Sequence, residues 1–395
     1  MKKKMRRLLA VFLFLTLIFT GCQAKEKTLE LVDHAVVMFG GEPRAVRQLR
    51  EAALAETDGI HQEYYFKQLN ESEQRVYREI LKGVEDFQEE ILVTSADDKV
   101  LERAYGALLR DHGELFWIHG RGVVYKTLYR TYGKFEPQYG YTKEEAQAIT
   151  QELTGKAKTF VDTIGAGATD YEKAKAVYAY VIQNVSYQTG TQDQNIAGAL
   201  YEGSAVCAGY ARAVQYLLEM LDVECIYVSG DMKGSDQGHA WNLVNLDGDY
   251  YYLDATNGDQ QDFLPEKEGE PQQVLYDYFC PYPTEYEVIC QPDDEFTVPE
   301  CTAVDRNLYV QQGSSFSSYD KEELRSYLME KIDEGTSLIS VKYQRPEDFA
   351  QARADWIDQQ ELKSMAVYYM EVMGVHQIQY SYGILEDFYT LYFMF

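Results

Sequence analysis

Three residues of the types that carry out acyl transfer occur in the order Cys207, His239 and Asp254, at separations of 32 and 15 residues. Acyl transfer from an amide needs a nucleophile, a base and a group that orients the base. A thiol is mostly protonated at neutral pH, whereas the partial positive charge at a helix N-terminus favours the thiolate. Cys207 opens the segment "CAGYARAVQYLLEML", whose apolar residues have helical spacing. The sequence therefore predicts a nucleophile at the start of a helix.

A hairpin is expected to bring the other two residues together. Asp247-Gly248 is a two-residue turn signal between the strand-like runs "HAWNLVNL" and "DYYYLDAT". If Leu246 faces Asp249, His239 and Asp254 become diagonal neighbours on one face, with Cα atoms roughly 7–8 Å apart. An imidazole and a carboxylate can meet across that distance.

In this interpretation His239 holds the proton and stabilises the thiolate, and Asp254 fixes the orientation of the imidazole. The backbone N–H of Cys207 is the expected oxyanion donor, with Tyr201 as a candidate second donor. Gly203 and Ser204 are candidate caps of the helix. Trp241 has two interpretations, a shield for the thiolate–imidazolium pair or a core side chain.

Each of the three residues also fits a structural role. Cys207 could be a small core residue or one half of a disulfide with Cys225. His239 could be a hydrogen-bonded residue of a strand, and Asp254 could cap the next turn. Their order, the helix start and the hairpin register together favour a triad.

The motifs "GSAVCAGYARAV", "GHAWNLV" and "YYYLDAT" resemble the transglutaminase-like superfamily of cysteine enzymes over residues from about 140 to 262. The resemblance implies a papain-like core, in which the helix bearing Cys207 packs on an antiparallel sheet bearing His239 and Asp254. It implies that these residues act as nucleophile, base and orienting group, and that the fold class is α+β. Many relatives have a tryptophan soon after the aspartate, where this chain reads "LDATNGD".

Two functions follow from different interpretations. The first is a thiol enzyme that acts on peptide or side-chain amide bonds, with hydrolysis favoured over cross-linking of proteins. The alternative is a catalytically silent surface binding module that retains the fold. Neither implies a metal or an organic cofactor, and the sequence does not give the substrate or the oligomeric state.

The N-terminus is expected to be a lipoprotein signal peptide over residues 1–21. Five basic residues precede 13 uncharged residues, "LLAVFLFLTLIFT", which is a typical length for a signal-peptide core and short for a membrane span. The following "GC" is similar to a bacterial lipobox, with Cys22 as the lipidated residue. The expected location is the extracytoplasmic face of a bacterial membrane, although an ordinary signal peptide with Cys22 incidental is the alternative.

Composition indicates a globular protein of 395 residues with 46% hydrophobic and 26% charged residues. The net charge is −27. Such a charge repels nucleic acid and suits the outside of a cell. The thiol-enzyme interpretation and the expected location imply a protein or peptide substrate of the cell envelope. Export permits disulfides, but three pairings of Cys225, Cys280, Cys290 and Cys301 are possible and the sequence does not choose among them.

Four regions are expected along the chain. Residues 1–21 are the signal peptide, and 22–139 form an α-rich region that contains a helix over 70–91. Residues 140–265 form the catalytic domain, with capping boxes at Thr142 and Thr169. Residues 266–395 form a small α+β region, which includes the proline-rich and acidic connector "PYPTEYEVICQPDDEFTVPEC".

Overall fold

The computed structural model describes residues 63–395, apart from 121, 127–131, 235–236, 261–262 and 265–271, together with isolated positions between 31 and 47. The chain divides into two compact units, the first ending at Ala146 and the second running from Gln147 to Phe395. The predicted signal peptide and Cys22 lie outside the described residues. Among the described residues, no helix has both the length and the apolar character needed to cross a membrane.

The first unit has the expected helices and short strands. Its helices are α4 (Glu71–Glu85) and α5 (Asp98–Asp111). Its strands β1 (Ile91–Val93), β2 (Val123–Lys126) and β3 (Gly133–Glu136) form an antiparallel sheet in the order β1-β3-β2. The expected helix over 70–91 is shorter than its apolar spacing suggested. It begins with a capping box at Asn70 and stops at Glu85, and Phe87 has a left-handed φ of 57°.

Three α-helices lead through the predicted catalytic domain. They are α6 (Lys143–Val161), α7 (Asp170–Asn184) and α8 (Cys207–Glu219). Both expected capping boxes are confirmed, because Thr142 and Thr169 each exchange hydrogen bonds with the glutamate three residues later. Strands β4 (Ser186–Tyr187) and β5 (Ser204–Ala205) pair in parallel directly before α8.

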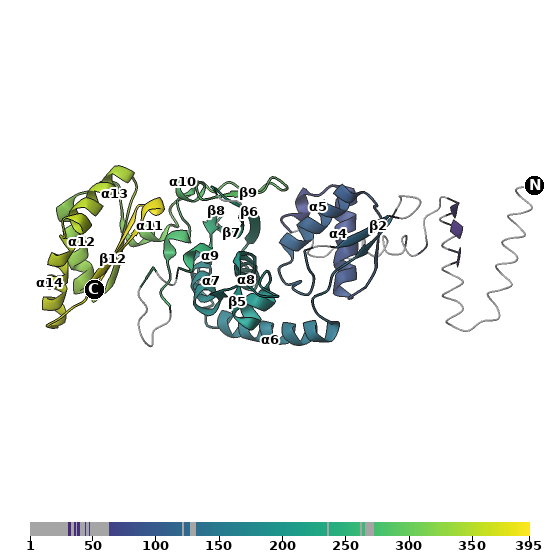
Figure 1. Ribbon diagram of the computed structural model, residues 1–395, viewed down its shortest axis with the longest axis horizontal. Helices are drawn as coiled ribbons and strands as arrows, with labels where there is room; N and C mark the ends of the chain where they lie inside the picture. Colours follow the sequence, from purple (N-terminus) through teal and green to yellow (C-terminus); the bar gives the residue numbers. More distant parts are fainter. Residues whose placement is uncertain are drawn as a thin grey trace, which may run out of the picture. The chain divides into compact units, whose positions relative to one another are not determined.

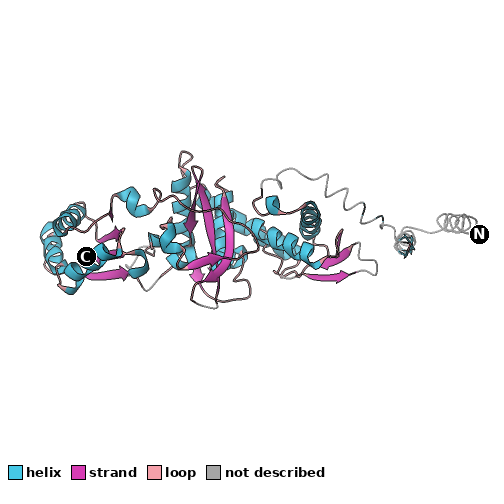
Figure 2. Cartoon of the chain, turned by 90° about the horizontal axis from the view of Figure 1, so that it is seen from above, coloured by secondary structure: helices cyan, strands magenta, loops and turns pink. Residues whose placement is uncertain are grey.

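A four-stranded antiparallel sheet faces α8. Its strands are β6 (Cys225–Met232), β7 (Gly238–Leu246), β8 (Asp249–Leu253) and β9 (Cys290–Pro292), in the order β8-β7-β6-β9. The predicted hairpin register is confirmed, since Leu246 pairs with Asp249 and Asn242 with Leu253. Figure 2 shows the strands of this sheet side by side.

Helix α8 packs against β6 and β7 of this sheet (Figure 1). Ala208 and Ala211 of the helix pack against Tyr227 and Ala240 of the sheet. These small or flat side chains allow the helix to approach the sheet closely. The Asn242 side chain donates from β7 to the Ala211 carbonyl at 3.0 Å. The helix start is thereby held at a fixed position on the sheet.

The sheet continues beyond the predicted boundary at residue 265. The turn helices α9 (Ala255–Gly258) and α10 (Pro283–Tyr286) precede β9, which pairs with the edge of β6. A Cβ on Gly230 would lie 2.0 Å from the Gln291 carbonyl oxygen, so this contact between β6 and β9 requires glycine. The predicted connector thus contributes a strand to the sheet that carries His239.

The C-terminal region is α+β, as its sequence indicated. Its helices are α11 (Leu308–Gln312), α12 (Lys321–Asp333), α13 (Pro346–Arg353) and α14 (Leu362–Met373). Its strands β10 (Ser315–Phe316), β11 (Leu338–Tyr343), β12 (Ser381–Leu385) and β13 (Thr390–Met394) form a sheet in the order β10-β11-β13-β12.

Buried polar contacts join this sheet to the segment before β9. Lys342 of β11 forms an ion pair with Glu285 at 2.8 Å, with side chains only 1% and 6% exposed. Asp277 accepts a hydrogen bond from Tyr309 at 2.8 Å and another from Tyr392 of β13. Removing one partner would leave a buried charge uncompensated, so these contacts fix the segment that leads to α10 and β9.

Candidate active site

Cys207 is the first residue of α8, as predicted, but its helix is capped differently. The N-cap is Val206, which contributes no capping side chain, and Gly203 and Ser204 lie in the preceding turn and strand. The first N–H groups of a helix have no partner inside the helix. At this helix start they are left to bind an anion beside the thiol, which is what an oxyanion site requires.

His239 and Asp254 form a buried pair. His239 Nε2 lies 2.8 Å from Asp254 Oδ2, and the two residues are only 7% and 1% exposed. The Cys207 side chain also interacts with His239 and helps to raise the pKa of the imidazole. Because Nε2 is engaged by Asp254, Nδ1 is the ring nitrogen left for the sulfur. The three residues are therefore brought together in the order thiol, imidazole, carboxylate.

Hydrogen bonds from His239, Asn257 and Tyr286 hold the Asp254 carboxylate in place. Its Oδ2 accepts from Asn257 Nδ2 at 2.7 Å and from the Tyr286 hydroxyl at 2.8 Å, in addition to His239. Its Oδ1 accepts from the backbone N–H of Asn257 at 3.0 Å, so Asp254 is also the N-cap of α9. One carboxylate can thus serve both roles expected from the sequence, as the cap of the next turn and as the group that orients His239.

The charges of the pair stabilise each other. Burial opposes the charge on His239, but the Asp254 carboxylate and the Cys207 side chain outweigh it and raise the pKa of His239 to about 10. Burial likewise opposes ionisation of Asp254, but His239 and the donated hydrogen bonds keep the pKa of Asp254 below its usual value. The favoured state at neutral pH is an imidazolium next to a carboxylate.

These pKa shifts predict how stability depends on pH. A raised histidine pKa adds stability that is complete below the unfolded value of 6.5 and is lost as pH rises through about 10. A lowered aspartate pKa adds stability that is present above 3.8 and is lost as pH falls through the folded-state value. Urea unfolding of wild type and His239→Gln should therefore give a difference in unfolding free energy that shrinks from pH 6 to pH 10. The same difference at both pH values would contradict the ion pair, and exposed His376→Gln is the control.

Trp241 fits both of its interpretations. It is 1% exposed on β7, and its ring stacks on His239 with centroids 5.9 Å apart and planes inclined by 22°. The indole therefore fills the core and covers one face of the imidazole.

Tyr201 is placed elsewhere. It lies in a π-helical turn (Ala197–Glu202), where its ring faces the ammonium of Lys156 at 5.1 Å and its carbonyl accepts from the same group. This position gives no support to its predicted role as the second oxyanion donor. Tyr187 of β4 is the tyrosine that interacts with Cys207, since burial and the nearby thiol raise the pKa of its hydroxyl. Tyr187 is 55% exposed, and no feature of the sequence pointed to it.

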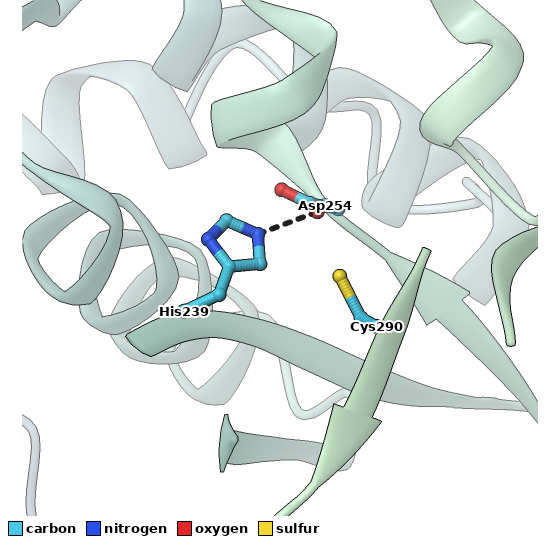
Figure 3. Close-up of side chains that lie close together, drawn as sticks. All are labelled: His239, Asp254 and Cys290. Carbon is cyan, nitrogen blue, oxygen red and sulfur yellow. Dashed lines mark hydrogen bonds and ion pairs between the residues drawn. The ribbon is translucent and has the colours of Figure 1, made fainter. Parts of the chain in front are cut away.

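Tyr286 and Cys290 are further site residues that sequence reasoning missed. Within the described part of the chain all five cysteines are free thiols, so Cys207 is not bound to Cys225. Cys290 lies beside the pair of His239 and Asp254, and the three side chains point toward one another (Figure 3). Burial raises the pKa of Cys290 to about 12, which makes it a poor nucleophile.

Tyr286 is expected to act as a positioning residue. Tyr286→Phe keeps the ring but removes the hydroxyl that donates to Asp254, so we expect kcat to fall about tenfold, the equivalent of one hydrogen bond to a charged group. KM should stay near its wild-type value, whereas the melting temperature should fall, because the buried Asp254 loses one of its hydrogen bonds. The matched control is Tyr252→Phe, whose hydroxyl contacts exposed Glu287 instead. Equal losses in both variants would contradict the role of Tyr286.

Fold and site together define an α+β domain of papain-like type, in which a cysteine at a helix start faces a histidine and an aspartate on an antiparallel sheet. Residues 158–255 match the family model described as the transglutaminase-like superfamily. The resemblance seen in the sequence is thereby confirmed over these residues.

Two curated relatives match part of the chain. Kyphoscoliosis peptidase of Homo sapiens is 25% identical over 134 residues, which cover 29% of this chain and 20% of the human protein. The protein of the same name from Mus musculus is 23% identical over the same shares. This chain thus spans about a fifth of the length of these relatives. A solved structure described as a TGase covers 38% of this chain and 47% of its own, at 14% identity and a TM-score of 0.27.

Proposed function

We propose that this protein is a thiol enzyme that acts on amide bonds through an acyl-enzyme on Cys207. The observation that carries the proposal is the buried contact of 2.8 Å between His239 and Asp254, next to a cysteine at the uncapped start of α8. A binding module has no need of a thiol, an imidazole and a carboxylate in this order.

The chemistry follows from the positions of the three residues. The Cys207 thiolate attacks the carbonyl carbon, and the developing oxyanion is stabilised by N–H groups at the start of α8. The C–N bond breaks as His239 gives its Nδ1 proton to the leaving amine, which leaves a thioester. Water or a second amine then attacks the thioester and returns a proton to His239. Asp254 holds the imidazole in one orientation during both steps and stays ionised.

We favour hydrolysis over cross-linking. Both share the first half-reaction and differ only in the acceptor that resolves the thioester. The matched relatives carry the name peptidase, which supports water as the acceptor. We further propose that the substrates are peptides or proteins of the cell envelope, since the N-terminal sequence favours a lipid anchor on Cys22 at the outer face of the membrane.

The test is a competition between acceptors. Purified protein is incubated with a mixture of peptides in heavy-oxygen water, with and without an excess of a primary amine, and products are read by mass spectrometry. Hydrolysis predicts new carboxyl termini that carry the heavy oxygen and persist with the amine present. Products that contain the amine would reassign the protein as a cross-linker. No product in either arm, together with an unreactive Cys207, would favour the silent binding module.

A further inference from the structure

The pair of His239 and Asp254 has a third neighbour that could bind a metal. One ligand atom each from His239, Asp254 and Cys290 lies within 4.8 Å of the other two (Figure 3). His239 lies on β7 and Asp254 directly follows β8 of the same hairpin, whereas Cys290 comes from β9, which is distant in the sequence. The separations follow no metal-binding motif, so this cluster could not be predicted from the sequence.

The cluster is rigid and shielded from water. His239, Asp254 and Cys290 are 7%, 1% and 4% exposed. Cys290 is held by the pairing of β9 with β6, where Met232 faces it. The Tyr286 hydroxyl donates to Asp254 at 2.8 Å and interacts with Cys290. The three ligand atoms, from β7, the N-cap of α9 and β9, thus lie close together in the buried interior.

The types of these donors suit a zinc-like ion. Zinc is bound by imidazole nitrogen, carboxylate oxygen and thiolate sulfur at about 2.0–2.3 Å, in tetrahedral geometry. Bonds of that length place neighbouring ligand atoms about 3.3–3.8 Å apart. Here Nε2 and Oδ2 would separate slightly from 2.8 Å, and the sulfur would move inward by about 1 Å or less. A fourth position would remain for water.

We propose that His239, Asp254 and Cys290 form a binding site for Zn²⁺ or a similar divalent transition metal, and that occupancy of this site switches the enzyme off. The metal replaces the proton on His239 Nε2 and the thiol proton of Cys290, and both protons leave to solvent. The Nε2–Asp254 hydrogen bond is then lost, and the metal-bound imidazole keeps its Nδ1 proton. It can no longer take up a proton from Cys207 or from an attacking water.

Metal binding itself does not depend on the proposed function, whereas inhibition does. The experiment therefore uses Cys207→Ala, which lacks the proposed nucleophile. Co²⁺ is the probe, because thiolate ligation gives it a charge-transfer absorption that oxygen and nitrogen ligands do not give. It is added without oxygen and left to equilibrate, since the site is buried. The second protein is Cys207→Ala/Cys290→Ala, and Cys207→Ala/Cys301→Ala is the control for another buried thiol.

We expect the absorption in Cys207→Ala and in the Cys301 control, displacement of Co²⁺ by Zn²⁺, and loss of the band with Cys290→Ala. The affinity for Zn²⁺ should fall by more than the roughly 10–100-fold that loss of an outer-sphere partner costs. Absence of the band in Cys207→Ala, or its persistence without Cys290, would overturn the site. If the band depends on Cys290 but the wild-type protein has no activity, the metal site is supported. Only the proposed function is then contradicted.

Discussion

Cys207→Ser is expected to lower kcat/KM for amide cleavage by about 10⁴-fold or more, the scale seen when a triad nucleophile is replaced. Serine has nearly the same size and fits the first position of α8, so helix and sheet should be unchanged. A hydroxyl ionises far less readily than a thiol, so serine is a much weaker nucleophile beside the His239–Asp254 pair. The measurement is the initial rate of peptide cleavage, with circular dichroism to verify the fold.

Cys225→Ala is the matched control for this experiment. Cys225 is buried at the start of β6, paired opposite Val244 and away from His239, which is paired with Gly230 near the other end of the strand. Its removal should leave kcat/KM within a few-fold of wild type in the folded fraction. Activity retained in Cys207→Ser, or lost equally in both variants, would show that Cys207 is not the nucleophile.

Asp254→Asn is expected to reduce kcat by about 10⁴-fold, as for an aspartate that orients a catalytic histidine. Asparagine caps a helix as well as aspartate does, so α9 should be retained. The asparagine amide can donate to His239 Nε2, which would move the imidazole proton to Nδ1. In that tautomer the nitrogen facing Cys207 can no longer accept its proton.

Asp259→Asn tests whether this loss is specific. Asp259 directly follows α9 and accepts hydrogen bonds from Tyr210 and Gln272 rather than from His239. The same change of carboxylate to amide there should cost stability but leave kcat within a few-fold of wild type. If Asp254→Asn had no more effect on kcat than Asp259→Asn, Asp254 would be only the cap of α9.

Local features of the sequence predicted the residues at the centre of the site. The Asp247-Gly248 turn fixes the register of β7 and β8 through contacts between near neighbours in the chain, so the positions of His239 and Asp254 followed from counting. Cys207 was found at the helix start because the apolar spacing of α8 begins there. The predicted N-cap of α8 was wrong. Serine and glycine are common N-cap residues, but the N-cap here is Val206, whose side chain makes no capping hydrogen bond.

Contacts between distant segments were beyond this reasoning. Tyr286 and Cys290 reach the site because β9 pairs with β6 across some 60 residues of chain, and nothing in "EYEVICQP" signals that pairing. Tyr201 was misplaced because the π-helical turn before β5 directs its ring toward Lys156. In the C-terminal sheet, the parallel pairing of β10 with β11 likewise depends on tertiary packing.

The most direct test of the account is the rate at which Cys207 is alkylated as a function of pH, measured by peptide mass spectrometry in wild type and in His239→Ala. The account predicts fast alkylation of wild type at pH 6, well below the range of about 8.5 where free thiols ionise. In His239→Ala the rate at pH 6 should drop at least about tenfold and recover only as pH rises. Slow alkylation of wild type at pH 6, or equal rates in the two proteins, would contradict a reactive Cys207–His239 pair.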